Sequence, residues 1–234
     1  MSRTSSPISG AAVDAIAPVL DCGNVVIPES TSPVGTTGRF AERLARLRPD
    51  LRFRSGNHSG QLDVYTAHCP ARAFPGHMVR ELIKKDRIIG GMTEACADRA
   101  QAVYQIFLQE KTFRTDAATV ELVKLVENAF RDVNVAFANE LSVICDGLGL
   151  NVWQVIELAN RHPRVVILQP GASVGGHCTA VDPWFIVSSA PKQARLIRTT
   201  RQVNDAKPRW HSLMREPRYR PRLVLTRDRC LRRG

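Results

Sequence analysis

The sequence lacks the features of a secreted, membrane-spanning or metal-binding protein. None of its apolar runs approaches the roughly 20 residues needed to cross a bilayer. The N-terminus, MSRTSSP, lacks the apolar core of a secretory signal. The six cysteines contain no CxxC pair or other metal-ligand spacing, so we expect free thiols rather than disulfides or zinc ligands. These absences favour a cytoplasmic protein with no metal site and no membrane partner.

The net charge of +11 is concentrated at one end of the chain. Residues 206–234 hold ten Lys and Arg side chains against Glu216 and Asp228, a net of +8 that leaves +3 for the rest. Arginines interrupted by prolines, with little hydrophobic periodicity, are typical of a disordered basic tail over residues 208–234. The alternative is a nucleic-acid-binding arm. We favour the tail, and nucleic acid is not expected as a partner.

Hydrophobic patterning predicts an α/β half followed by an all-helical half. The first half is expected to contain helices over 11–21 and 37–48, and buried strands over 23–30, 63–70 and 87–91. This alternation predicts a layer of parallel strands. Shorter helices of the second half are expected over 93–109, 151–160 and 192–205.

The longest predicted helix covers about residues 116–147. Apolar residues recur there at steps of three and four, Thr115 or Asp116 can cap its start, and Gly147 and Gly149 end it. At 1.5 Å per residue such a helix is about 45 Å long. This length suggests a helix that is shared with a second subunit or that bridges two domains.

Two groups of polar residues in the helical half have chemical potential. Lys124 and Asn128 are four residues apart on one face of the long helix, and Arg131 lies near the same face. Such a stripe is also typical of an ordinary solvated face. His162 and Arg164 belong to a basic cluster before a glycine-rich stretch, where cations and loop amides can hold a phosphate or diphosphate.

One cysteine stands out from the other five. The sequence GASVGGHC (171–178) places Cys178 directly behind glycines, in a stretch too glycine-rich for a helix interior. Glycines let the backbone approach a ligand closely, and a cysteine there becomes a nucleophile where a neighbouring cation stabilises its thiolate. The alternative is a free thiol in a loop without a chemical role. Cys145, by contrast, follows apolar residues in a helical pattern and is expected to be buried filler.

The chain closely resembles the UDP-glucose/GDP-mannose dehydrogenase family in three stretches: ELVKLVENAFRDVNVAFANELSVIC, LANRHPRVVILQPGASVGGHCTAVDPWFIV and ARLIRTTRQVND. Within the family it is most similar to the branch that oxidises UDP-N-acetyl-D-mannosamine. ESTSPVGTT and PGHMVRELIKKDRIIGGMT fit the same family, so the resemblance covers about residues 11–207. It implies the C-terminal part of a Rossmann NAD-binding domain over 1–92, a central helical dimerisation and catalytic-cysteine domain over 93–207, and the basic tail.

The resemblance also implies a reaction, the NAD-dependent oxidation of the C6 alcohol of a UDP-sugar to a carboxylate in bacterial surface polysaccharide synthesis. Cys178 would trap the aldehyde as a thiohemiacetal, which a second hydride transfer converts to a thioester. Lys124 would act as acid/base and stabilise the oxyanion, while Asn128 and Asp182 would orient water and substrate. Thr31 matches a position near the nicotinamide. Positions that match contacts to the UDP-sugar are Arg72, Ala73, Lys124, Asn128, Arg131, His162, Arg164 and Gly175.

The chain departs from the family in three ways. It has no GxGxxG turn, which in the family holds the pyrophosphate of NAD at a helix N-terminus. The family's C-terminal nucleotide-sugar domain is expected to be absent, and the tail has the composition of a shifted reading frame. The family's CPER reads CPAR, so Ala71 replaces a glutamate that helps to activate water, and Ala172-Ser173 replaces Pro-Gly. We therefore expect a truncated chain with weak turnover or none.

Two other interpretations stay open. One is UDP-glucose 6-dehydrogenase, because one sequence does not identify the residues that select the sugar. The other is a non-catalytic module that forms homodimers through the long helix.

Overall fold

The computed structural model describes residues 7–53, 61–71, 82–172, 174 and 176–215. Contacts between residues divide the chain into two compact units. Unit 1 comprises residues 1–131 and 176–198, and unit 2 comprises residues 132–175 and 199–234. Among the described residues, no helix is both long enough and apolar enough to cross a membrane.

Unit 1 is built on a four-stranded sheet with the strand order β1-β2-β3-β4. The strands are β1 (Val25–Val26), β2 (Tyr65–His68), β3 (Arg87–Gly91) and β4 (Thr112–Asp116). The sequence predicts a layer of parallel strands, and β1/β2 is parallel as expected. The pair β3/β4 is also parallel, but β2 and β3 are antiparallel, so the sheet is mixed.

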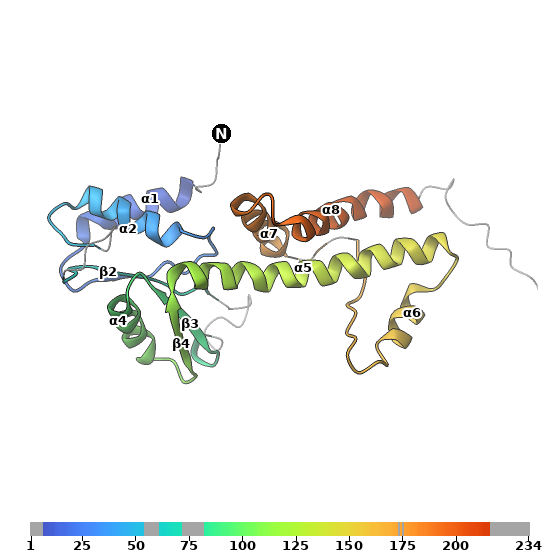
Figure 1. Cartoon of the computed structure of the whole chain (residues 1–234), viewed down its shortest axis with the longest axis horizontal. Helices are drawn as coiled ribbons and strands as arrows, with labels where there is room; N and C mark the ends of the chain where they lie inside the picture. The colour runs from blue at the N-terminus through green and yellow to red at the C-terminus, as the bar shows by residue number, and fades with distance from the viewer. Residues whose placement is uncertain (1–6, 54–60, 72–81, 173, 175, 216–234) are drawn as a thin grey trace, which may run out of the picture. The chain divides into compact units, whose positions relative to one another are not determined.

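Helices cover both faces of this sheet because side chains alternate along its strands. Val26 faces a core with α1 (Pro7–Ile16) and α2 (Thr36–Leu47), whereas Val25 faces a core with α4 (Glu94–Gln105). Figure 1 shows α1 and α2 on one side of the strands and α4 on the other. A short 3₁₀ turn, Ala17–Val19, follows α1. The first predicted helix, over residues 11–21, therefore consists of the second part of α1 and this turn.

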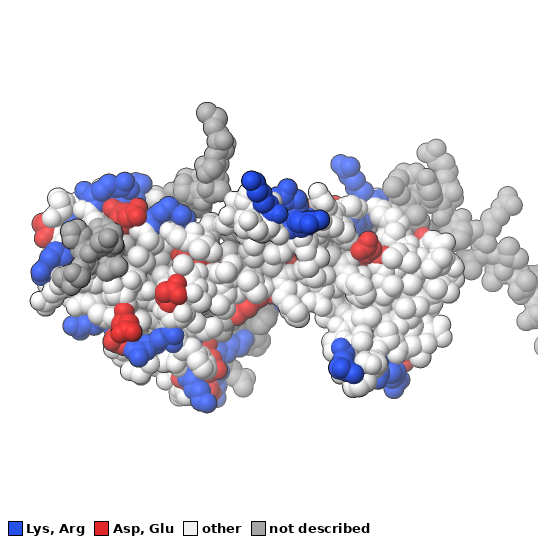
Figure 2. Space-filling view, viewed as in Figure 1, with Lys and Arg blue, Asp and Glu red and all other residues white. Residues whose placement is uncertain are grey.

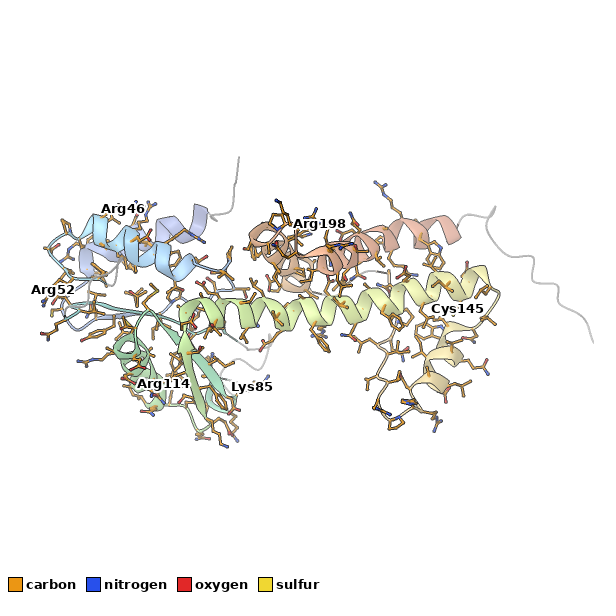
Figure 3. The ribbon with its side chains drawn as sticks, viewed as in Figure 1. Arg46, Arg52, Lys85, Arg114, Cys145 and Arg198 are labelled. Carbon is orange, nitrogen blue, oxygen red and sulfur yellow. The ribbon has the colours of Figure 1, made fainter. Side chains whose placement is uncertain are left out.

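Helix α5 (Ala117–Gly147) confirms the long predicted helix (Figure 1). Asp116 caps its start as expected, since its carboxylate accepts hydrogen bonds from the amide and the hydroxyl of Thr119 at 2.9 and 2.6 Å. Cys145, near the other end of the helix (Figure 3), is 2% exposed and is the buried filler that the pattern predicts. Strand β4 lies where the sequence predicts only a break between two helices. Its residues are exposed or half-buried, so no buried run marks it.

Unit 2 contains a buried polar network that holds α8 (Arg195–Arg215) against α5. The Oδ1 atom of Asp132 accepts hydrogen bonds from Arg201 at 2.7 Å and from Asn204 at 2.8 Å. The Nδ2 atom of Asn139 donates to Asn204 at 2.9 Å, while its Oδ1 atom accepts from the amide of Gly171 at 2.9 Å. Since buried polar groups need partners, this network fixes both α8 and the start of the glycine-rich stretch to α5.

Helix α8 continues to Arg215, past the point at which the sequence predicts a basic tail. The ammonium group of buried Lys207 donates to Ser142 and lies 3.6 Å from the centre of the Trp210 ring. The bond to Ser142 packs one side of this part of α8 against α5. The charge-rich sequence does not suggest this packing. Residues 216–234 lie outside the described part of the chain. A shorter helix, α6 (Val152–Ala159), confirms another prediction and completes the secondary structure described for unit 2.

Helix α7 (His177–Ser189) occupies a stretch that the sequence predicts as a loop. Gly176, at a φ of 99°, is its N-cap, and this left-handed conformation explains why glycine stands there. The glycines therefore end where the helix begins. Cys178 lies in the first helical turn instead of in a loop.

Removing one partner of the Asp132–Arg201 pair will destabilise the chain. The two side chains are 0% and 3% exposed, so Arg201→Ala leaves an uncompensated charge in the interior, at a cost of about 3–5 kcal/mol. Urea titration should show this loss as a lower midpoint. The matched variant Arg43→Ala breaks the exposed pair with Asp14 and should cost about 1 kcal/mol or less. Equal effects in the two variants would contradict the prediction.

Candidate active site

The centre of the candidate site is a contact between α5 and α7, both within unit 1 at this point. The Nδ2 atom of Asn128 donates a hydrogen bond to Oδ2 of Asp182. Asp182 is 4% exposed, and Asn128 is half-buried. The structure therefore brings together two of the four residues to which the resemblance assigns catalytic roles.

The other two lie one helical turn from this contact. Lys124 precedes Asn128 by four residues on α5, and Cys178 precedes Asp182 by four residues on α7. Four residues correspond to about 6 Å of helix rise and keep each pair on one face. The Cys178 thiol is exposed and Lys124 is half-buried, so solvent reaches both.

A buried carboxylate that the sequence analysis missed lies one turn before Lys124. Glu121 is 1% exposed and accepts hydrogen bonds from Gly35 and Thr37, at the start of α2. A glutamate in a helical pattern is usually solvated, so nothing in its spacing distinguishes it.

The segment after β1 carries the position matched to the nicotinamide. Thr31 is half-buried and follows the carboxyl end of β1, the edge at which ligands bind in α/β sheets. Glu29, at the same edge, accepts a hydrogen bond from the hydroxyl of Tyr104. Burial raises the pKa of Tyr104, and burial likewise raises the pKa of the neighbouring Cys69 thiol. Burial therefore favours the protonated form of both groups.

The remaining predicted positions fall into two groups. His162 and Arg164 are exposed in unit 2, where the backbone amide of Arg164 donates to Nδ1 of His162 at 3.3 Å. Arg131 is exposed on α5, at the end of the part that belongs to unit 1. Three further positions, Arg72, Ala73 and Gly175, lie outside the described residues.

Charge on the described surface is mixed. Figure 2 shows acidic and basic side chains interspersed over the sheet-containing unit, with few charges along α5 in this view. Several basic side chains have carboxylate partners close by, as in the pair of Arg52 (labelled in Figure 3) and Asp63 at 2.7 Å. The described residues contain no cluster of three or more His, Cys, Asp or Glu side chains that could hold a metal ion.

Two parts of the sequence match models of one protein family. The NAD binding domain of the UDP-glucose/GDP-mannose dehydrogenase family matches residues 8–108, and the central domain of the same family matches residues 118–206. The chain belongs to this family. The first match contains strands β1, β2 and β3 of the sheet of unit 1, and the second begins within the first turn of helix α5.

Two curated relatives are similar along most of this chain. NDP-N-acetyl-D-galactosaminuronic acid dehydrogenase of Ralstonia nicotianae is 60% identical over 202 residues, which cover 86% of this chain and 47% of the relative. UDP-N-acetyl-D-mannosamine dehydrogenase of Escherichia coli K12 is 60% identical over 199 residues, which cover 85% and 47%. The chain thus spans about half the length of the family members that it matches.

Solved structures support the same assignment. The UDP-D-ManNAc dehydrogenase from Pyrococcus horikoshii superposes with a TM-score of 0.80 at 41% identity, over 89% of this chain and 48% of that chain. A UDP-N-acetyl-mannosamine dehydrogenase from Staphylococcus aureus superposes with a TM-score of 0.73 at 43% identity, over 87% and 46%. The fold of the described part is therefore the family's fold.

The site environment predicts a pH dependence of stability. His68 is 0% exposed on β2, and burial lowers its pKa, although Glu121 and Glu29 oppose the shift. Below the unfolded value of about 6.5, the unfolded chain binds a proton that the folded chain does not. The free energy of unfolding should therefore fall as the pH is lowered through this range, by at most about 1.4 kcal/mol per pH unit for one proton.

The test compares the wild type with His68→Leu by urea titration between pH 7.5 and 5, values chosen to bracket an unfolded pKa of about 6.5. The difference in unfolding free energy between the two proteins should change with pH, in favour of the variant at the acid end. A difference that is constant over this range would show that His68 does not contribute.

Proposed function

We propose that this chain carries the cysteine-bearing part of an NAD-dependent oxidation of the C6 alcohol of UDP-N-acetyl-D-mannosamine to the carboxylate. The contact between Asn128 and Asp182 is the observation that carries the proposal. It joins the helix of Lys124 to the helix of Cys178, and each of these two residues precedes the contact by four positions on its own helix. We infer that a C6 group bound beside this contact meets both the amine and the thiol. Similarity to a UDP-N-acetyl-D-mannosamine dehydrogenase supports this substrate, and similarity to an NDP-N-acetyl-D-galactosaminuronic acid dehydrogenase supports the wider class of nucleotide-linked N-acetylated sugars.

In the proposed reaction, Lys124 takes the proton of the C6 hydroxyl while a hydride leaves C6, which gives the aldehyde. The Cys178 sulfur then adds to the carbonyl carbon, and the ammonium group of Lys124 stabilises the oxygen of the resulting thiohemiacetal. Loss of a second hydride leaves a thioester on Cys178. Water oriented by Asn128 and Asp182 hydrolyses it, which releases the carboxylate and restores the thiol. Bound NAD supplies the hydride acceptor for each oxidation.

The described residues of this chain suit contact with the nicotinamide end of NAD, but the sequence has no motif for its pyrophosphate. Thr31 is half-buried after the carboxyl end of β1 and would contact the nicotinamide through its hydroxyl. No GxGxxG turn exists anywhere in the sequence to hold a pyrophosphate. Ala71 also has no side chain that could activate the hydrolytic water, and loss of a positioned base costs about 10²–10⁴ in rate. The proposal therefore includes weak or absent turnover by this chain alone.

A spectrophotometric assay with NAD and UDP-N-acetyl-D-mannosamine tests the turnover claim. The purified chain should form NADH at least about 100-fold more slowly than the full-length Escherichia coli relative under the same conditions. Cys178→Ser should abolish any residual rate. NADH formation at a rate close to that of the relative would overturn this part of the proposal.

Alkylation by iodoacetamide tests substrate binding without turnover. Among the described cysteines, Cys178 and Cys22 are exposed, whereas Cys69, Cys96 and Cys145 are buried. We expect UDP-N-acetyl-D-mannosamine to slow the alkylation of Cys178 at least about fivefold and to leave Cys22, the internal control, unchanged. Peptide mass spectrometry measures both rates in one sample. Equal protection of the two thiols, or of neither, would contradict the proposed site, and stronger protection by UDP-glucose would favour the alternative substrate.

A homodimer through α5 is the second part of the proposal. Three large apolar side chains at four-residue steps, Leu122, Val126 and Phe130, are 42%, 49% and 71% exposed and line one shallow groove. Phe137 and Ile144, further along the helix, are also more than half exposed. Exposed apolar patches of this kind mark interaction surfaces, and a second copy of the same helix offers a matching stripe.

Sedimentation velocity tests the dimer. The wild type should sediment as a dimer, and Phe130→Asp should shift it to monomers because the new charge would be buried in the apolar contact. Phe113→Asp is the matched control, since Phe113 is 51% exposed on β4, away from this stripe. A monomeric wild type, or equal loss of the dimer in both variants, would contradict the proposal. A dimer that binds neither NAD nor UDP-sugar would instead favour the non-catalytic module.

A further inference from the structure

The carboxylate of Glu121 on α5 is buried and accepts three hydrogen bonds within unit 1. Its Oε1 atom accepts hydrogen bonds from the amide and the hydroxyl of Thr37, both at 2.7 Å. Its Oε2 atom accepts from the amide of Gly35 at 2.5 Å. Glu121 and Thr37 are 1% and 0% exposed, so water does not compete for these bonds.

The three bonds replace an ordinary helix cap. Gly35 is the N-cap of α2 and has no side chain to accept from the first amides of the helix. Its φ of 84° also disfavours the side chains that normally cap. The first amides of a helix have no partner within the helix, and the helix dipole favours negative charge there. A carboxylate from α5 therefore supplies both the acceptors and the charge.

The same bonds fix one end of the segment that carries Thr31. Within this segment the hydroxyl of Ser32 donates to the carbonyl of Ser30 at 3.0 Å, and the hydroxyl of Thr36 donates to the carbonyl of Pro33 at 2.5 Å. The backbone amide of Thr36 also donates to the carbonyl of Pro33, at 3.1 Å, which closes a turn directly before α2. The chain from Thr31 to this turn is only two residues long, so the position of the turn limits where Thr31 can lie.

We propose that Glu121 is a positioning residue that fixes the segment of Thr31 to the helix that carries Lys124 and Asn128. We call the three hydrogen bonds from Gly35 and Thr37 to Glu121 the clamp. Lys124 follows Glu121 by three residues, so the clamp and the proposed acid/base lie in the same turn of α5. A displacement of the segment would change the distance between the nicotinamide position and the amine. This inference rests on the proposed function in one respect, namely that Thr31 and Lys124 serve the same reaction.

Hydrogen exchange of the full chain tests the clamp directly. In Glu121→Gln an NH₂ group replaces one carboxylate oxygen, and it would face an N–H or O–H donor of Gly35 or Thr37 without forming a hydrogen bond. The backbone amide hydrogens of Gly35 and Thr37 should therefore exchange at least about tenfold faster than in the wild type. Glu140→Gln is the matched control, because it makes the same chemical change at an exposed position of α5. It should leave exchange in residues 31–37 unchanged. Unchanged exchange in Glu121→Gln, or equal acceleration by Glu140→Gln, would overturn the proposal.

Two conservative variants of Thr37 distinguish the contribution of its hydroxyl group from that of its side-chain packing. Thr37→Val removes the hydroxyl donor at nearly constant volume and should accelerate exchange of the same two amides. Thr37→Ser keeps the donor and should restore slow exchange. If valine and serine act alike, the hydroxyl has no part in the clamp.

A cofactor readout tests the positioning role. NADH should slow iodoacetamide labelling of Cys178 in the wild type, and Glu121→Gln should lose this effect while UDP-N-acetyl-D-mannosamine still protects the thiol. Equal NADH protection in wild type and variant would overturn the positioning role. If NADH protects neither protein, the proposed cofactor function fails and the positioning role with it. The exchange result would then still decide whether the clamp exists, so the two failures are distinguishable.

Discussion

The rest of the structure depends on the partnering of polar side chains along one face of α5. Glu121 bonds to the start of α2, Asn128 to α7, Asp132 to α8, and Asn139 to the amide of Gly171. The steps between these residues are seven, four and seven, which keep all four on one side of a helix with 3.6 residues per turn. Because a buried polar group without a partner costs free energy, each contact specifies one neighbour and one register.

This arrangement reverses the usual amphipathic pattern, since the polar stripe of α5 is covered and an apolar stripe is exposed. The apolar periodicity predicted the existence, the cap and the length of the helix. It did not predict the covered face, because polar residues in a sequence normally indicate solvent. Leu122, Val126 and Phe130 lie about half a turn away from the polar stripe. Their exposure is the structural reason to propose a second copy of the helix.

Other differences from the sequence analysis have local causes. Strand β4 is exposed or half-buried along its whole length, so no hydrophobic run marked it, whereas buried β3, of the same length, was predicted at its observed limits. The glycines before Cys178 suggested a loop, but they end at an N-cap with positive φ, after which a helix begins. For the site, spacing alone placed Lys124 and Asn128 on one face. Asp182 came only from the resemblance, and Glu121 was missed because its partners lie more than 80 residues away in the sequence.

The two halves of the proposed chemistry depend on different parts of the chain. Addition of the Cys178 thiol to an aldehyde is redox-neutral and needs only a carbonyl, a thiol and a stabilised oxygen. The contacts that support it, between α5 and α7, lie wholly among the described residues of unit 1. Removal of a hydride needs a cofactor anchored by its pyrophosphate, and the sequence has no glycine turn for that anchor. The proposed capture of an aldehyde by Cys178 therefore draws on residues of α5 and α7 alone, whereas the proposed oxidation also needs an anchor for the cofactor.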